Sequence, residues 1–232
     1  MYAVRVIGVD GCPGGWLAMA FDGDSVVPRF HPTFSELVLN YPAVGCIAVD
    51  IPIGLSAGAP RACDLAARRI LGRRGSSVFP APDPRLLDSA THPEASAQSR
   101  VLVGKGLSIQ SFGIFPKVAE VNRLMTPLLQ NWIVEVHPEV SFWALAGGRP
   151  MEQSKGNAAG FEERAALLAS VLGVRIPDRK EAASITRPCS PDDVLDAIVA
   201  AWTASRIVNG TAERLPGDAE RNESGLRMEI VY

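Results

Sequence analysis

The sequence predicts an α/β fold in which a mixed sheet of antiparallel and parallel strands is flanked by helices. Continuous apolar runs at residues 4–9 and 44–49 each end in an aspartate, Asp10 or Asp50. Apolar runs without alternation are typical of strands that are covered on both faces, as at the centre of such a sheet. The helix with the clearest start and stop signals is predicted at residues 190–208. Strands that alternate with helices in this way predict a layered α/β domain.

An antiparallel hairpin is expected near the N-terminus. A glycine-rich turn at residues 11–15 follows Asp10, and strand-like segments at 16–21 and 26–31 come next. The stretch Asp22-Gly-Asp24 separates these two segments and is a hairpin signal. The segments on either side of each turn are therefore expected to pair in antiparallel fashion.

The rest of the chain alternates between helical stretches and one further buried strand. That strand is expected at residues 132–137, and residues 226–232 alternate as a short edge strand does. Helical spacing occurs at residues 33–41, 61–71, 93–103, 116–126, 158–172 and 190–208, with one more helix opening at Pro138. Residues 75–92 are rich in Ser, Pro and Asp and are expected to form a loop. We predict one domain over residues 1–232, with residues 75–130 as a helical and loop insertion.

The helix at residues 190–208 has a clear start and a face of small residues. Ser190 stands at the position of an N-cap. Ala197, Ala200 and Ala201 are small enough to let this helix approach the sheet closely.

The overall charge gives no sign of a nucleic-acid-binding surface. The 232-residue chain has a formal net charge of −2, so no general positive field attracts nucleic acid or an anionic membrane. A nucleic-acid substrate would need a local basic patch. No apolar run approaches the ~20 residues that span a bilayer, and the chain opens into a strand pattern without a signal segment. We therefore expect a cytoplasmic protein that does not enter the membrane.

The cysteines predict neither a zinc site nor a redox pair. The four of them are far apart in the sequence and form no CxxC motif. Cys12 and Cys46 lie in or beside strands expected to be buried, where free thiols are typical of a reducing compartment.

Acidic residues are expected to gather at one edge of the sheet. Asp10 and Asp50 each follow a buried strand, and the carboxyl ends of parallel strands lie side by side where α/β proteins bind ligands. Two buried carboxylates close together imply a cation or a shared proton. Asp193 and Asp196 are three residues apart on one helix face and can point toward the same site. Oxygen ligands without clustered histidine or thiolate suit Mg²⁺ or Mn²⁺ better than Zn²⁺.

This order of strand-aspartate, hairpin, strand-aspartate and a late helix with paired aspartates resembles the ribonuclease H-like superfamily. More narrowly, the chain resembles the family known as domain of unknown function 429, whose members carry the label of ribonuclease H-like nucleases. The matching stretches are VDGCPGGW (9–16), VDIPIGL (49–55), RRGSSVFPAP (73–82), EVHPEVSFWAL (135–145), DDVLDA (192–197) and GLRMEIVY (225–232). They span nearly the whole chain, and the resemblance implies a ribonuclease H-like mixed sheet.

The resemblance also implies site residues. Asp10 matches the first-strand metal aspartate of the superfamily, Asp50 matches the carboxylate after the fourth strand, and Asp193 and Asp196 match the acids of the C-terminal helix. Such acids would hold two Mg²⁺ or Mn²⁺ ions ~3.5–4 Å apart, which activate a water and stabilise the leaving oxygen of a phosphodiester.

Two glutamates match only the pattern of the narrower family. On that basis Glu135 is predicted to be a metal ligand and Glu139 a catalytic residue. Asp193 has a simpler interpretation as well, because acids in the first turn favour the helix dipole whatever the function. Asp10 could instead cap its turn or act as a phosphorylated nucleophile, although that chemistry expects a second aspartate where Cys12 stands. A dinucleotide site is not predicted, because a strand rather than a helix follows the glycines of the first turn.

Basic residues that could contact a substrate phosphate are concentrated in and after the helix at 61–71, where Arg61 begins the group. Arginines offer bidentate contacts to phosphate, but a solvated helix face partly balanced by Asp64 explains them equally well. The candidates for phosphate contact are Arg68, Arg69, Arg73, Arg74, Lys117 and Lys155. His137 either assists proton transfer or caps the next helix.

The combined pattern predicts a metal-dependent phosphodiesterase, specifically a nuclease, with nucleic acid or another phosphodiester as its substrate. The predicted catalytic residues are Asp10, Asp50, Asp193, Asp196 and Glu139. The alternatives are a phosphotransferase of the actin-like or sugar-kinase class, which generally needs two such lobes, and a non-catalytic binding module with the same fold. The chain is also a candidate for homodimer formation.

Overall fold

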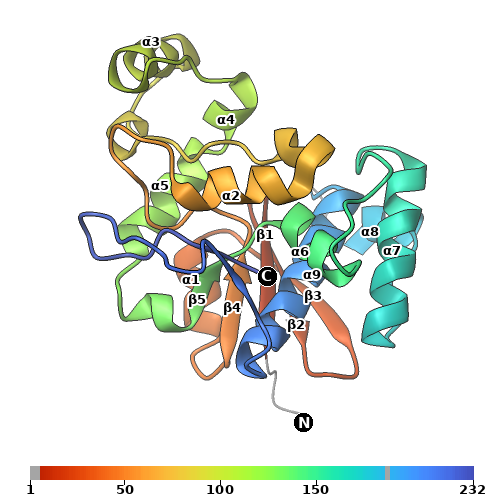
Figure 1. Ribbon diagram of the computed structural model, residues 1–232. Coiled ribbons are helices and arrows are strands. Elements are labelled where there is room, and N and C mark those ends of the chain that lie inside the picture. The colour runs from red at the N-terminus through yellow and green to blue at the C-terminus, as the bar shows by residue number, and fades with distance from the viewer. Residues whose placement is uncertain (1–5, 186–188) are drawn as a thin grey trace.

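A five-stranded sheet runs through the middle of the molecule (Figure 1). The structure is a computed structural model that describes residues 6–185 and 189–232. β2 is antiparallel to β1 and β3, and β4 is parallel to β1 and β5, in the order β3-β2-β1-β4-β5. The strands are β1 (Val6–Cys12), β2 (Gly15–Phe21), β3 (Val26–His31), β4 (Cys46–Val49) and β5 (Ile133–Glu135). This mixed sheet flanked by helices confirms the predicted α/β fold and is compatible with a ribonuclease H-like arrangement.

The hairpin predicted at the glycine-rich turn of residues 11–15 forms, and its turn consists of two residues. β1 and β2 pair as far as Cys12 and Gly15, so Pro13 and Gly14 alone make the connection. Gly14 has a φ of 79°, a left-handed conformation that glycine adopts without steric cost. The hairpin keeps β1 extended beyond its predicted end, and Asp10 therefore lies inside the strand.

Helices α1 (Phe34–Asn40) and α5 (Phe115–Leu124) cover one face of the sheet. Thr33 caps α1 by accepting a hydrogen bond from the N–H of Glu36. Ile7 and Val9 of β1 pack on this side, whereas Val6 packs on the other. Because side chains alternate along a strand, residues 8 and 10 of β1 also face away from α1 and α5.

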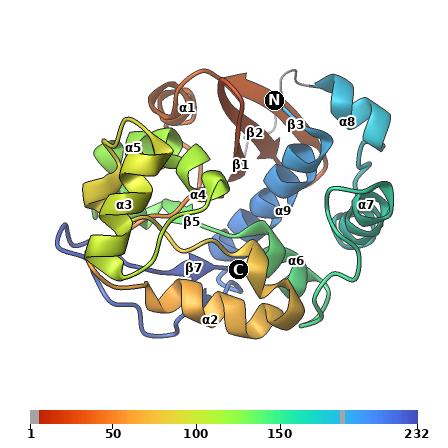
Figure 2. The same ribbon diagram turned by 90° about the horizontal axis from the view of Figure 1, so that it is seen from above.

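Helix α9 (Pro191–Val208) crosses the opposite face, against β1 and β4 (Figure 2). A Cβ atom on Gly8 would overlap the backbone of Ala197 and Ala201. The contact therefore needs a glycine in the strand as well as the small helix residues that the sequence shows. Helices α7 (Ala158–Leu172) and α8 (Arg179–Ile185) pack beside α9, and α8 is not among the predicted helices.

The segment between α2 (Ala62–Leu71) and β5 is mostly helical. It contains η1 (Gly72–Ser77), η2 (Pro84–Leu86), α3 (His92–Val103), α4 (Ile109–Gly113), α5 and η3 (Leu129–Asn131). α3 and α4 stand above the sheet edge in Figure 1, but α5 returns to the sheet and joins its core through Val118 and Val121. The predicted insertion at 75–130 thus includes one helix that belongs to the core. After β5, α6 (Pro138–Leu145) begins at the predicted proline.

The end of the chain forms a second, small sheet. β7 (Ile230–Val231) pairs with β6 (Arg214–Leu215) in antiparallel fashion. The edge strand expected at residues 226–232 is therefore shorter than predicted. It is part of this second sheet and not of the central one. In the part of the chain that the structure describes, no helix combines the length and apolarity needed to cross a membrane.

Two of the cysteines meet although they are far apart in the sequence. Cys12 and Cys189 form a disulfide with a Cα–Cα distance of 5.1 Å and a sequence separation of 177. The expectation of a free thiol at Cys12 is therefore wrong, because the fold places the end of β1 beside the residue that precedes the α9 cap. Cys46 and Cys63 are free and buried, as expected for Cys46. The cytoplasmic location stays a prediction.

Candidate metal centre

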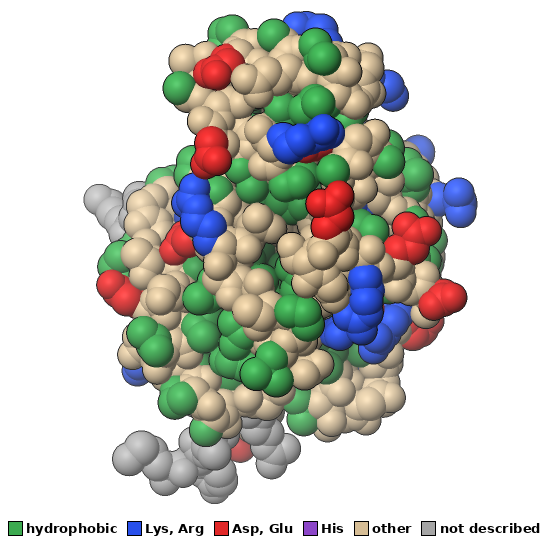
Figure 3. All heavy atoms as spheres, turned by 90° about the vertical axis from the view of Figure 1, so that its left-hand side faces the viewer, with side chains coloured by type: hydrophobic (Ala, Val, Ile, Leu, Met, Phe, Trp, Pro, Cys, Tyr) green, Lys and Arg blue, Asp and Glu red, His purple; other side chains and the backbone are tan. Residues whose placement is uncertain are grey.

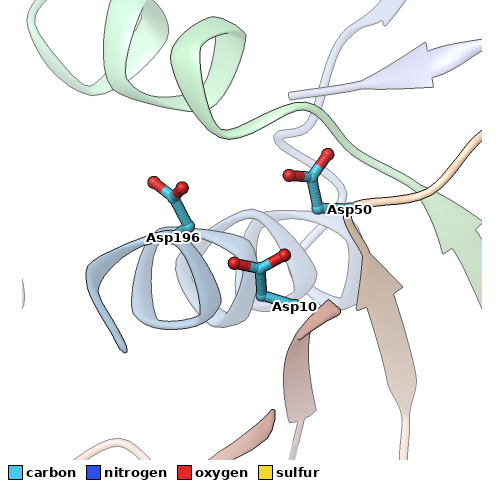
Figure 4. Close-up of side chains that lie close together, drawn as sticks. All are labelled: Asp10, Asp50 and Asp196. Carbon is cyan, nitrogen blue, oxygen red and sulfur yellow. The ribbon is translucent and has the colours of Figure 1, made fainter. Parts of the chain in front are cut away.

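Three aspartates meet at the carboxyl edge of the sheet (Figure 4). Asp10, Asp50 and Asp196 each contribute one carboxylate oxygen, and these three oxygens lie within 4.8 Å of one another. The residues come from β1, from the position after β4, and from α9. The structure thus brings together three predicted site residues that are far apart in the sequence.

Strand pairing places two of these side chains next to each other. β1 and β4 are parallel with Val9 opposite Val49, and the N–H of Asp50 donates to the carbonyl of Val9 at 2.9 Å. Val9 and Val49 both pack on the α1 and α5 side. Alternation therefore turns the next residues, Asp10 and Asp50, toward the opposite side. There Asp196, on α9, completes the group.

Asp196 has one charged partner. Its Oδ2 accepts a hydrogen bond from Nζ of Lys155 at 2.7 Å. The Asp196 side chain is 1% exposed, whereas that of Lys155 is 49% exposed, so the lysine stands between the buried acid and solvent. The charge of Asp196 raises the pKa of Lys155, which keeps the lysine cationic. Among the residues that the structure describes, Oδ1 of Asp196 has no hydrogen-bond partner.

The two aspartates at the strand ends resist ionisation when no cation is present. Burial, together with the charges of Asp50 and Asp196, raises the pKa of Asp10 well above its usual range. Burial and the charge of Asp196 raise the pKa of Asp50 to about 7. A divalent cation favours the ionised form of a nearby carboxylate and would reverse both shifts. The electrostatics are therefore those of a site that lacks positive charge.

The spacing and chemistry of the oxygens suit a divalent ion. Two oxygens on opposite sides of one Mg²⁺, each bound at ~2.1 Å, are ~4.2 Å apart. Oxygens that already lie within 4.8 Å of one another need only small side-chain movements to close around such an ion. Carboxylate oxygens are the ligands that Mg²⁺ and Mn²⁺ prefer. The residues present can therefore hold either ion.

Glu135 points away from this group. It lies opposite Val49 in β5, so its side chain emerges on the face that is turned away from α9. Two nitrogens of Arg61 donate to its two oxygens at 2.7 and 2.6 Å, and the N–H of Ile53 donates at 2.6 Å. The predicted metal role of Glu135 is therefore replaced by a structural one, because it fixes the segment that follows β4. Arg61 is 2% exposed and is not available to a substrate.

Glu139, predicted to be catalytic, is also engaged elsewhere. It forms an ion pair with Arg164, whose side chain is 1% exposed. Arg164 also donates to the carbonyls of Gln153 and Gly160 at 3.2 and 3.0 Å. These contacts tie α6 to α7 and to the segment that carries Lys155. Glu139 therefore helps to hold that segment through one oxygen, while its Oε2 is buried without a hydrogen-bond partner among the described residues.

Asp193 caps its helix. The N–H and the hydroxyl of Ser190 donate to its Oδ2 and Oδ1 at 2.7 and 2.8 Å, and the two residues form a capping box. Both carboxylate oxygens accept a hydrogen bond in this cap, and the charge of Asp193 still contributes to the raised pKa values of Asp10 and Asp50. Asp196 is the acid of α9 that joins the metal centre.

A comparison with protein-family models agrees with the family resemblance seen in the sequence. A family model described as a protein of unknown function, DUF429, matches residues 8–221, a span that contains all three aspartates. The chain belongs to this family. No curated protein and no solved structure matches the chain. Membership of DUF429 carries no activity with it, so the chemistry has to be inferred from the site.

Of the two lysines predicted to bind phosphate in this DUF429 chain, Lys155 contacts the aspartates. Lys117, on α5, donates to the carbonyl of Gly15 and stands 4.5 Å from the ring centroid of Trp16. Burial lowers the pKa of Lys117, and the charges of Glu120 and Asp10 oppose that shift. Lys117 is thus held against the β1–β2 hairpin.

The arginines predicted to contact phosphate differ in their surroundings. Arg68 and Arg74 donate to backbone carbonyls at 3.2 and 3.1 Å, whereas Arg69 and Arg73 are exposed. Within residues 6–185 and 189–232, no hydrogen bond or ion pair joins any of the four to the three aspartates. His137 occupies the N-cap position of α6, but its side chain makes no capping bond.

Proposed function

We propose that this protein is a metal-dependent phosphoester hydrolase and that phosphodiester bonds of nucleic acid are its substrate. The observation that carries the proposal is the convergence of Asp10, Asp50 and Asp196, with oxygens within 4.8 Å of one another. Acids buried so close together are costly unless a cation joins them. The resemblance to the ribonuclease H-like superfamily assigns acids at these same places to phosphodiester cleavage.

The residues of the chain have distinct tasks in this proposal. Bound Mg²⁺ or Mn²⁺ would polarise the phosphoryl group and activate water, and two ions are what the sequence predicts. The three aspartates hold the cation, and Lys155, half-exposed beside Asp196, attracts the phosphate. Glu135 and Glu139 support the segments on which the site is built.

One face of the molecule lacks a broad surface for the phosphates of a nucleic acid (Figure 3). On the face shown in Figure 3, which is the left-hand side of Figure 1, acidic and basic side chains are interspersed and form no broad basic patch. The net charge of the chain is −2. Extended duplex binding depends on many phosphate contacts with lysine and arginine, and this face does not offer them.

Cleavage assays test the proposal directly. Labelled DNA, RNA and DNA–RNA hybrid, together with bis(p-nitrophenyl) phosphate as a small phosphodiester, are incubated with the protein in Mn²⁺ or in chelator. We expect cleavage in Mn²⁺ that is abolished by chelator and by Asp10→Asn or Asp50→Asn. Asp88→Asn, which changes a side chain that is 89% exposed, is the matched control and should cleave as the wild type does. Equal cleavage by wild type and Asp10→Asn, or no metal-dependent cleavage of any of the four substrates, contradicts the proposal.

A further inference from the structure

We propose that Lys155 takes the place of a second metal ion, so that each chain binds one divalent cation. This inference rests on the proposed function, and it departs from the two ions that the sequence predicts. It starts from the position of one ammonium group within the acid cluster, where Nζ of Lys155 lies 2.7 Å from Oδ2 of Asp196.

The charges of the cluster balance with one ion. Ionised Asp10, Asp50 and Asp196 carry three negative charges, and Lys155 adds one positive charge. Asp193 and Lys117, whose charges also act on Asp10, offset each other. The difference of two negative charges equals the charge of one Mg²⁺ or Mn²⁺. A second divalent ion would give this largely buried group a net positive charge before any substrate arrived, and burial makes such an excess costly.

Asp196 links the lysine to the place of the ion. In sites with two ions ~3.5–4 Å apart, both ions draw on the same small set of acids. Here one oxygen of Asp196 is occupied by Lys155. Its other oxygen is buried and without a partner in the described chain. That leaves one oxygen of Asp196 for an ion shared with Asp10 and Asp50, and the lysine where a neighbouring ion would stand.

The lysine extends from a backbone segment that is held in place. The N–H groups of Glu152 and Gln153 donate to the two oxygens of Glu163 on α7, each at 2.8 Å. Arg164, also on α7, donates to the carbonyl of Gln153 at 3.2 Å. A backbone fixed two residues before Lys155 limits where its ammonium group can reach. A fixed position of this kind is what a group needs in order to replace an ion.

Lys155 also stands where a substrate arrives. Its side chain is 49% exposed, against 1% for Asp196, so a phosphate coming from solvent meets the ammonium group first. A lysine is a compact positive charge with several donors, which suits a phosphate oxygen. Lys155 would then offset charge on the phosphoryl group in the transition state, which is the task of the second ion in two-ion sites.

Counting bound Mn²⁺ tests this inference without any substrate. The full chain is titrated with Mn²⁺ and followed by electron paramagnetic resonance of the free ion and by calorimetry. We expect one Mn²⁺ per wild-type chain and loss of that ion in Asp10→Asn. Lys155→Ala should bind a second ion, or bind the first roughly tenfold more tightly, because a competing positive charge is gone. Lys155→Arg keeps the charge and should bind one ion, as the wild type does.

The outcomes separate this inference from the proposed function. Two Mn²⁺ per wild-type chain, or a Lys155→Ala protein with unchanged number and affinity, overturns the inference even if metal-dependent cleavage is found. One Mn²⁺ with the expected response to Lys155→Ala, in a protein that cleaves no phosphoester, supports the inference and overturns the proposed function. Circular dichroism and thermal unfolding establish that each variant is folded before it is titrated.

Discussion

Two groups of buried acids lie at the same edge of the sheet, on opposite faces. One is the candidate metal centre of Asp10, Asp50 and Asp196, and the other is the Arg61 cluster of Arg61, Asp64 and Glu135. The metal centre has three carboxylates beside one half-exposed lysine. In the Arg61 cluster, a guanidinium group that is 2% exposed contacts both carboxylates. The second group has a buried cation of its own, whereas the first has only a half-exposed one.

The difference shows that burial of acids at strand ends does not by itself mark a ligand site. In the Arg61 cluster, the N–H of Ile53 donates to Glu135 and the N–H of Ala81 donates to Asp64, in addition to the bonds from Arg61. Raised pKa values do not separate the two groups, because burial raises the pKa of Glu135 to about 7, as it does for Asp50. The partners separate them: the two acids of the Arg61 cluster share a buried guanidinium group, whereas the ion pair of the three aspartates is with the half-exposed Lys155.

The largest expected effect on stability comes from removing the arginine of the Arg61 cluster. Arg61→Leu leaves Glu135 and Asp64 buried without their cation, which should lower the free energy of unfolding by about 3–5 kcal/mol. Urea unfolding followed by circular dichroism measures this change. Arg69→Leu, at an exposed position of the same helix, is the control and should change stability little. If the two variants are equally stable, the Arg61 cluster does not support the fold.

An intermediate effect, of opposite sign, is expected in the metal centre. Asp10→Asn replaces a carboxyl group whose ionisation is opposed by burial and by neighbouring charges, so the metal-free protein should be as stable as the wild type or more stable. The wild type should gain about 2.7 kcal/mol in Mg²⁺ at a hundred times its dissociation constant, and Asp10→Asn should lose this gain. Thermal unfolding in Mg²⁺ and in chelator measures both. Glu135→Gln should show the reverse pattern, with lower stability and an intact response to Mg²⁺. If both variants respond to Mg²⁺ in the same way, the candidate metal centre and the Arg61 cluster do not differ in metal binding.

The smallest expected effect is a pH dependence that belongs to the metal centre. Asp50 keeps its proton in the folded chain up to a pKa of about 7, whereas the unfolded chain releases it near pH 4. Between these values the folded state binds more protons, so the contribution of Asp50 to stability is lost as the pH rises from about 4 to about 7. A pKa difference of about three units corresponds to about 4 kcal/mol, and solvent screening lowers this value because Asp50 is partly exposed. Urea unfolding in chelator should therefore show a decline of about 1–2 kcal/mol more in the wild type than in Asp50→Asn. Saturating Mg²⁺ should flatten the decline, and an identical decline in both proteins would assign it to other groups.

Much of the fold could be predicted because its signals are local. The apolar runs that become β1 and β4 are continuous, and the cap and first turn of α9 stand next to each other in the sequence. Helix α8 was not predicted, and neither was α4, which has only five residues. So few turns give too short a periodic pattern to be distinguished from a loop.

The site could be predicted only in part. That Asp10 and Asp50 would meet follows from parallel pairing, because each stands directly after an apolar run. The face on which Glu135 emerges depends on the pairing register of β5, and a shift of one residue reverses that face. The sequence does not reveal this register. Lys155 lies on an irregular segment between α6 and α7, so its position follows from tertiary contacts that no local pattern encodes.

The close packing of Gly8 against Ala197 has a consequence for how the protein is made. β1 leaves the ribosome early and α9 leaves it late, yet the two are in direct contact in the finished molecule. Until α9 has been synthesised, the strands it will cover expose an apolar face, and such nascent chains are prone to aggregate. Translation that stopped before residue 196 would yield a chain unable to assemble its group of three aspartates, however well its first four strands had paired.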